Sequence, residues 1–497
     1  MKNDMNDRTV FKAIFEPGSI AFVGASSDVF KWGFNILHHL VRGGFKGNIY
    51  PVNPSGGSWY GIRMHPSISS LPGPADLAVI IVPREAVLSA VRECAASGIR
   101  AAIIITAGFS ETGRDGARLE AEVASVARAG GVRLVGPNTM GVFSGYPSPM
   151  QAVMMSSPIG AGGAAVISQS GNLATSISYR LMRKNIGISR LVSSGNEADL
   201  RVEDFLEMME NDEKTRLVCM YMEGAREGRR FLEASRRISM KKPLILVKGG
   251  TGQAGAGAAM SHTGAMAGSS DVFRSMCRQA NVIYADSVDE MTDIAGILLS
   301  QPEIRGSRVG IVTQGGGWGV LSADLCESLD LDIPVLGKKT ISLLDNMLPP
   351  FWSRRNPVDL VAPGRVSMIT DAVEILLGSG ETDAIVLLGM GYLTARARGW
   401  LMSPVIPAES VRDRAMRMIE EEATLLDLIE KQIKRYGKPI IPVMDLIAFD
   451  EQPEYNLVKK FEARGIAVFS SPDPAIRALA KVMEYYRLRR LHACKQG

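Results

Sequence analysis

The 497-residue sequence lacks several patterns that would assign it to a specialised class of protein. Its five cysteines are far apart and form no CxxC pair or Cys/His cluster, which argues against a zinc site and against a disulfide framework. No run of about 18 apolar residues occurs, so no membrane-spanning helix is expected. The N-terminus has no apolar core of the signal-peptide type. Together these absences predict a protein of the reducing cytoplasm.

The sequence also lacks a basic block, and the turn after its first expected strand lacks a dinucleotide fingerprint. Its net charge of +4 is spread along the chain, so neither nucleic acid nor a membrane surface is expected as a partner. The turn after the first expected strand, VGASSDVFKWG, does not contain GxGxxG, and Asn53 stands where an NAD enzyme carries an acidic residue for the ribose. An NAD-dependent oxidoreductase is therefore disfavoured, and a different nucleotide-like ligand is preferred.

Short runs rich in Val and Ile alternate with helix-length amphipathic stretches, which is typical of βα units and a parallel sheet. The pattern predicts an α/β fold of three doubly wound domains with five strands each. Boundaries are expected near residues 150 and 303, giving domains 1–150, 151–303 and 304–497. The expected strands are 19–26, 48–54, 76–83, 101–108 and 133–138; then 164–171, 188–196, 216–223, 243–249 and 282–287; then 308–316, 332–337, 384–391, 438–445 and 466–472.

The second and third strand sets begin alike, which suggests a duplicated unit. VISQSGNLATSISYRL and IVTQGGGWGVLSADLC both read as a strand, a small-residue turn and a helix. The stretch 395–437 is longer than one crossover helix needs. It is expected to be an inserted helical hairpin, with 420–437 as its better helix.

Three turns between a strand and a helix are candidate anion sites, because free N–H groups and the helix dipole favour negative charge there. They are VGASSDVFKWG, with Gly24, Ser26 and Ser27; SQSG at 168–171; and TQGGG at 313–317. For the first turn the alternative is a purely structural strand-helix connection. Two such turns in duplicated positions form a more specific pattern than one.

A glycine-rich stretch from Gly249 to Gly268 carries His262 and has seven glycines in twenty residues. It is expected to be a mobile loop, and an imidazole on a flexible arm can carry a group between two places. The alternative is an ordinary solvated histidine. Glu223 ends an expected strand and could orient the ring, unless it pairs with Arg226 or Arg229.

In these motifs the chain resembles the α subunit of NDP-forming acyl-CoA synthetases, also called ADP-forming acetate-CoA ligases, and more distantly the α subunit of succinyl-CoA synthetase. The resemblance covers almost the whole length in the family's order. It is carried by VGASS, YPVNP, DLAVIIVP, ITAGFSETG, GPNTMG, SQSGNLATSI, GNEADLRVEDFLE, MEGAREGRRF, SHTGAMAGS, TQGGGWGVLSADL and NPVDL.

The resemblance implies a first domain that is Rossmann-like and binds CoA, followed by two flavodoxin-like domains. It implies that His262 is phosphorylated and that Glu223 positions it. The phosphate cradle would be formed by Ser170, Gly171, Asn172, Gly315, Gly316 and Gly317. CoA would contact Gly24, Ser26, Ser27, Lys31, Pro51, Asn53, Val82, Pro83, Ala107 and Asn138. No metal ligand on this chain is implied.

The activity implied is the interconversion of acyl-CoA, NDP and phosphate with a carboxylic acid, CoA and NTP. ATP or ADP with magnesium would bind a separate ATP-grasp β subunit, in an α2β2 assembly. Two positions depart from the family: Thr139 replaces a frequent cysteine near the CoA sulfur, and 395–437 has no clear counterpart. A competing interpretation is a CoA-binding regulatory or scaffolding module.

Overall fold

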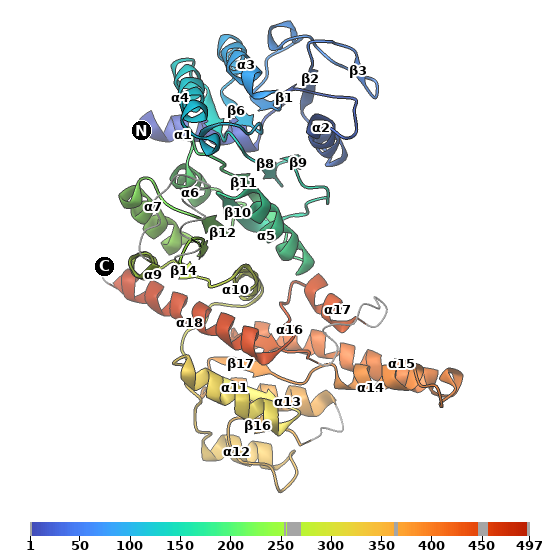
Figure 1. Ribbon diagram of the computed structural model, residues 1–497. Helices are drawn as coiled ribbons and strands as arrows, with labels where there is room; N and C mark the ends of the chain where they lie inside the picture. The colour runs from blue at the N-terminus through green and yellow to red at the C-terminus, as the bar shows by residue number, and fades with distance from the viewer. Residues whose placement is uncertain (1, 253–254, 256–269, 362–365, 446–455, 495–497) are drawn as a thin grey trace. The chain divides into compact units, whose positions relative to one another are not determined.

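The computed structural model describes residues 2–252, 255, 270–361, 366–445 and 456–494 (Figure 1). The chain divides into two compact units, residues 1–291 and 292–497. Each unit is an α/β structure, which confirms the predicted fold class. In the part of the chain that the structure describes, no helix combines the length and apolar character needed to cross a membrane.

The first sheet is parallel and has the strand order β2-β1-β5-β6-β7. All five strands lie where the sequence predicts them: β1 (Ser19–Val23), β2 (Asn48–Val52), β5 (Leu77–Ile80), β6 (Ala101–Ile104) and β7 (Arg133–Val135). The helices α2 (Trp32–Arg42), α3 (Arg84–Ala96) and α4 (Arg114–Ala129) connect them. The strand order reverses between β1 and β5, and ligands of doubly wound sheets bind at the carboxyl ends of the strands at this point.

The second sheet belongs to the same unit and has the order β14-β13-β12-β10-β11-β8-β9. Its five parallel strands match the predicted set: β10 (Ala161–Ser168), β11 (Ile188–Ser193), β12 (Leu217–Met222), β13 (Leu244–Lys248) and β14 (Ile283–Tyr284). The order reverses between β10 and β12, so the SQSG turn and Glu223 follow the two strands at this reversal. The helix α5 (Gly171–Arg183) begins directly after the turn.

Two further strands of the second sheet were not predicted. The hairpin of β8 (Gly141–Ser144) and β9 (Met150–Val153) pairs antiparallel with β11. The sequence around residue 150, where the first domain boundary was predicted, instead forms a hairpin whose strand β8 covers the edge of β11. Sheet pairing therefore joins this hairpin to the second sheet, whereas the boundary predicted at residue 150 assigned most of it to the first domain.

The second unit contains a parallel sheet with the order β16-β15-β17-β18 among its described residues. β15 (Val309–Thr313), β17 (Ala384–Leu387) and β18 (Ile440–Pro442) were predicted, and β16 (Val358–Asp359) was not. The strands predicted at 332–337 and 466–472 are wrong, because each makes only one isolated bridge. In the first of them Pro334 has no N–H to donate to a neighbouring strand.

The predicted helical insertion is present, with a different division into helices. α14 (Tyr392–Leu401) and α15 (Ala408–Ala423) lie side by side, and their small cluster of Ala397, Ala415 and Ile419 is buried (Figure 1). The helix predicted at 420–437 is divided at Thr424, where α16 (Leu425–Tyr436) begins. α16 packs against α13 (Val366–Gly378) in the core of this unit.

Arg190 on β11 is a buried cation that joins three parts of the first unit. Its guanidinium donates to Asp212 at 3.1 Å, to the Tyr146 carbonyl at 2.6 Å and to Glu16 at 2.7 Å. It also lies over the ring of Phe11 on α1 (Lys2–Phe15), with 5.0 Å from its carbon to the ring centroid. This one side chain therefore ties the N-terminal helix and the β8–β9 connection to the second sheet.

We expect Arg190→Met to lower the free energy of unfolding by roughly 3–5 kcal/mol, because it leaves Asp212 buried without its cation. Arg180→Met is the matched control: Arg180 pairs with Asp289, but its side chain is 45% exposed, and such pairs contribute below about 1 kcal/mol. Thermal and urea unfolding of both variants measure the difference. Equal destabilisation by the two substitutions would contradict this role.

Candidate functional site

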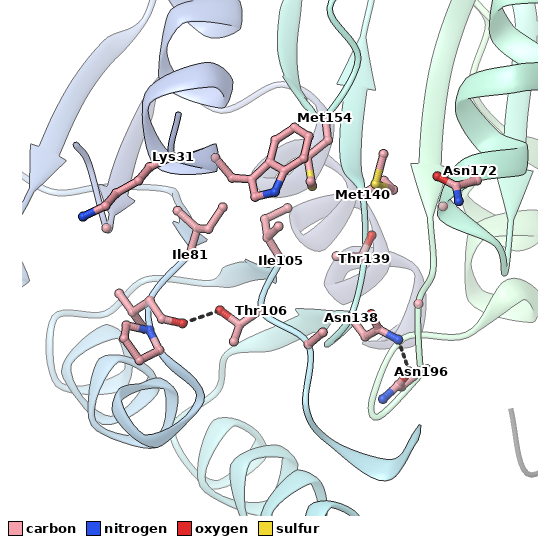
Figure 2. A pocket seen from close by; sticks show the side chains of 18 of the residues that line it. Lys31, Ile81, Ile105, Thr106, Asn138, Thr139, Met140, Met154, Asn172 and Asn196 are labelled. Carbon is pink, nitrogen blue, oxygen red and sulfur yellow. Dashed lines mark hydrogen bonds between the residues drawn. The ribbon is translucent and has the colours of Figure 1, made fainter. Parts of the chain in front are cut away.

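A cavity of about 720 Å³ lies where the carboxyl edge of the first sheet faces the start of α5, and Figure 2 shows it from close by. Four segments of the first domain contribute, each following a strand, and the SQSG turn contributes from the second sheet. The lining residues are Gly24, Phe30, Lys31, Trp32, Gly33, Ile81, Val82, Pro83, Ile105, Thr106, Ala107, Asn138, Thr139, Met140, Met154, Gln169, Ser170, Gly171, Asn172, Gly195 and Asn196.

Gly24 begins the turn after β1 and has a φ of +100°. A Cβ at this position would lie 2.1 Å from the carbonyl oxygen of Ile81, so only glycine fits. The turn is held from the other side by Asn53, whose Nδ2 donates to the Ala25 carbonyl at 2.8 Å. The side-chain amide of Asn53 is therefore already hydrogen-bonded to the protein's own backbone.

The far wall of the cavity is the segment after β7. Asn138 has a φ of +58°, and its Nδ2 donates to Oδ1 of Asn196 at 3.2 Å, as drawn in Figure 2. The Thr139 hydroxyl donates to the Ser193 carbonyl at 2.5 Å and accepts from the Gly141 N–H at 3.0 Å. The threonine found in place of a cysteine therefore bonds to the backbone of the second sheet.

The start of α5 presents backbone amides to the cavity. Ser170 caps the helix, and its Oγ accepts from the Leu173 N–H at 3.5 Å. The N–H groups of Gly171 and Asn172 lie in the first turn, where helix geometry provides no backbone acceptor. This end of the cavity is suited to an anion.

Lys31 is the only charged side chain among the described residues that line the cavity. Around it the lining is backbone, amide side chains and the apolar groups of Ile81, Ile105, Met140 and Met154, all drawn in Figure 2. Within the described residues, no three His, Cys, Asp or Glu side chains are grouped so that they could hold a metal ion. The described lining therefore offers a ligand one cation and several uncharged hydrogen-bond donors.

Glu223 lies directly after β12 and is 9% exposed. Its Oε1 accepts from the Tyr221 hydroxyl at 3.3 Å, while its Oε2 is buried without a hydrogen-bond partner among the described residues. The ion pairs considered from the sequence are not formed, because Arg226 donates to the Asn196 carbonyl and Arg229 pairs with Glu233.

Lys248 ends β13 beside Glu223. Its ammonium group donates to the Glu223 carbonyl at 2.6 Å, and burial lowers the pKa of Lys248 although Glu223 opposes this change. The lysine therefore supports the backbone that carries the Glu223 carboxylate.

The cavity brings together nine of the residues predicted for the site, and their roles stay predictions. They are Gly24, Lys31, Val82, Pro83, Ala107, Asn138, Ser170, Gly171 and Asn172. Five others in the same unit do not line it: Ser26, Ser27, Pro51, Asn53 and Glu223. Gly315–Gly317 start α11 (Gly316–Ser328) in the second unit. His262 lies outside the described residues.

Sequence reasoning missed Met140, Met154, Gln169 and Asn196 as cavity residues. Gln169 and Asn196 lie within the quoted motifs SQSG and GNEAD, so their place after a strand was a usable signal. Met140 and Met154 are adjacent because the Met154 N–H donates to the Met140 carbonyl at 2.9 Å, a contact made by the unpredicted hairpin.

Comparisons with known proteins agree with this arrangement. Residues 18–144 match the family described as CoA binding domain, and residues 161–298 match the succinyl-CoA ligase like flavodoxin domain. The acetate–CoA ligase [ADP-forming] II subunit alpha of Pyrococcus furiosus is 36% identical over 95% of this chain and 97% of its own. The corresponding I subunit alpha is 32% identical over 97% and 99%.

The chain therefore belongs to the family of ADP-forming acetate–CoA ligase α subunits. A solved structure, acetyl-coenzyme A synthetase 1 of Ca. Korarchaeum cryptofilum in complex with phosphate and ADP, is 31% identical and has a TM-score of 0.84. The alignment covers 98% of this chain and 99% of that one. The predicted family and fold are confirmed.

We expect Gly24→Ala to destabilise the first unit by roughly 2–5 kcal/mol, from the strained backbone together with the collision at Ile81. Gly56→Ala is the control: Gly56 also has a positive φ, of +61°, but a Cβ there meets nothing within 4 Å. Thermal unfolding measures both. If Gly24→Ala lowered the unfolding temperature no more than Gly56→Ala, the close approach of Gly24 to the Ile81 carbonyl would not require glycine.

Proposed function

We propose that this chain is the α subunit of an enzyme that interconverts acyl-CoA, ADP and phosphate with a carboxylic acid, CoA and ATP. One observation carries the proposal: a single cavity joins the carboxyl edge of the CoA-binding-type sheet to the first turn of α5. A thioester entering from one side can therefore reach an anion held on the other. Membership of the ligase family supports the same reaction.

CoA would bind along the first sheet. Lys31 is placed to neutralise a CoA phosphate, and the turn at Gly24 lets that phosphate approach the backbone. Val82, Pro83 and Ala107 would contact pantetheine, with Asn138 near the sulfur. We keep Ser26 and Ser27 as further contacts of the CoA phosphates, and Pro51 and Asn53 as contacts along the adenosine and pantetheine.

The chemistry would take place at α5. A phosphate oxygen attacks the thioester carbonyl carbon, the carbon–sulfur bond breaks, and CoA thiolate leaves an acyl phosphate behind. His262 then attacks phosphorus, the phosphorus–oxygen bond breaks, and the carboxylate leaves. Gly171 and Asn172 amides would hold the phosphoryl oxygens throughout. The unpaired Oε2 of Glu223 is available to accept the N–H of the histidine ring.

The phosphoryl group would leave this chain for ADP on a partner. We propose an ATP-grasp β subunit as that partner, with magnesium bound beside the nucleotide, in an α2β2 assembly. The start of α11, with Gly315–Gly317, would supply a second helix dipole to the phosphoryl group. The glycines around His262 would give its loop the reach for this transfer.

Incubating the chain with acetyl phosphate should place an acid-labile, base-stable phosphoryl label on it. His262→Ala should abolish the label, and Glu223→Gln should slow labelling by about 10- to 100-fold, as expected when a group that orients a nucleophile is lost. Acid and base treatment of the labelled protein identifies the bond. Equal labelling of wild type and His262→Ala would refute the assignment.

The lining of the cavity also favours an acyl group without a second carboxylate. Lys31 would be engaged by CoA phosphate, and no other charged side chain lies among the described lining residues. A distal carboxylate would then be placed among Ile105, Met140 and Met154, where an unpaired charge is costly. We propose a monocarboxylic acid as the substrate.

Butyryl-CoA and succinyl-CoA have acyl chains of equal length, and calorimetry should find succinyl-CoA bound at least about tenfold more weakly. Met154→Lys should reduce the difference in affinity between the two thioesters, because it adds a cation to the cavity. The control Met402→Lys should leave that difference unchanged, because Met402 is exposed in the second unit. Equal affinities in the wild type would contradict the monocarboxylate proposal alone.

A further inference from the structure

The turn after β11, Ser194 to Ala198, touches both ends of the cavity. Gly195 approaches the first domain so closely that a Cβ would lie 2.3 Å from the Pro137 carbonyl oxygen. The N–H of Asn196 donates to that carbonyl at 2.9 Å, and the N–H of Ala198 donates to Gly136 at 3.1 Å. The turn is therefore fixed to the backbone that presents Asn138.

Glu197 of the same turn faces the other way, toward the second sheet. It is 3% exposed, and its Oε1 accepts from Oγ of Ser194 at 2.7 Å and from Nε2 of Gln169 at 3.2 Å. A buried carboxylate with two such donors has a defined orientation.

Gln169 links Glu197 to the backbone beside Glu223 through hydrogen bonds. Its Oε1 accepts from the N–H groups of Glu223 at 2.6 Å and Gly224 at 3.2 Å, and its Nε2 also donates to the Gly224 carbonyl at 2.8 Å. Since two N–H groups face Oε1, the amide can have only one orientation, and Nε2 must then find acceptors. Glu197 supplies one of them.

We propose that Glu197 is a positioning residue for phosphoryl transfer: through Gln169 it fixes the backbone that carries Glu223, while its own turn is bonded to the segment that carries Asn138. This inference rests on the proposed function. In this proposal the turn from Ser194 to Ala198 aligns the end of the cavity that holds the CoA thiol with the end that holds the phosphoryl group.

The ionised form of Glu197 is the better acceptor for two donors. Burial raises the pKa of Glu197 to about 7, the hydrogen bonds from Ser194 and Gln169 oppose this increase, and Glu203 adds to it. Protonation of Glu197 below that pH therefore weakens the hydrogen bond that it accepts from Gln169. The charged groups around this turn and its partners include Glu203, Arg226, Glu223, Lys248, Glu111 and Glu120.

The test is the single-turnover rate of His262 phosphorylation by acetyl phosphate, measured between pH 5.5 and 8.5 on the full chain. The wild-type rate should fall about tenfold below an inflection near pH 7 from Glu197, in addition to the loss caused by protonation of the attacking imidazole, whose ordinary pKa is about 6.5. Glu197→Ala should be about 30- to 100-fold slower at pH 8, and its profile should keep only the imidazole inflection. Glu197→Gln keeps an acceptor oxygen and should recover most of the rate, again without the Glu197 inflection.

Glu203→Gln is the matched control, because Glu203 is a second buried glutamate, 1% exposed, on α6 (Val202–Glu210). It should keep the rate at pH 8 and shift the inflection slightly downward. CoA affinity, measured by calorimetry, should stay within about twofold in all variants.

A pH profile of Glu197→Gln identical to that of the wild type would overturn the inference while leaving the proposed function intact, and Glu197→Gln decides the matter even if Glu197→Ala fails to fold. No label on the wild-type chain would instead overturn the proposed function, and the inference with it.

Discussion

The close contact between two backbone segments, 136–138 and 194–198, is the constraint on which the site depends. The first segment ends the sheet of the CoA-binding domain, and the second follows β11 of the succinyl-CoA ligase-like sheet. Gly195 makes the approach possible, and the amides of Asn196 and Ala198 bond across it. This contact therefore fixes the two halves of the cavity relative to each other at the point where they meet.

The contact also explains why the chemistry can be divided between two similar sheets. Each sheet reverses its strand order once, and at each reversal the loops after neighbouring strands diverge and leave room for a ligand. The first reversal provides the turn at Gly24, and the second provides the SQSG turn. The two reversals face each other and form one cavity, in which Lys31 is the one cation among the described lining residues.

Much of the fold and the site could be predicted from the sequence. All ten strands predicted for the first two sheets are present, because buried parallel strands are uniform apolar runs bounded by small residues. The predicted strands in the third domain were less reliable: DIPVLG is apolar, but its proline prevents regular pairing. The pairing of the β8–β9 hairpin depends on a distant edge strand, so no local pattern in its own sequence reveals it.

Within the site, the residues that follow strands were predictable, since their place comes from topology alone. The orientation of Gln169 and the burial of Glu197 were not, because they result from contacts between segments more than twenty residues apart. The same holds for Arg190, whose partners Glu16, Tyr146 and Asp212 come from three separate stretches of the chain.

The β8–β9 hairpin has a practical consequence for anyone who divides this protein. A fragment that begins at residue 151 would lose β8, which covers this edge of β11, and it would expose the hydrogen-bonding groups along the edge of a buried strand. Such an uncovered edge is a template for pairing with another copy. Separate expression of the second domain should therefore start before Gly141, so that the strand keeps its natural neighbour.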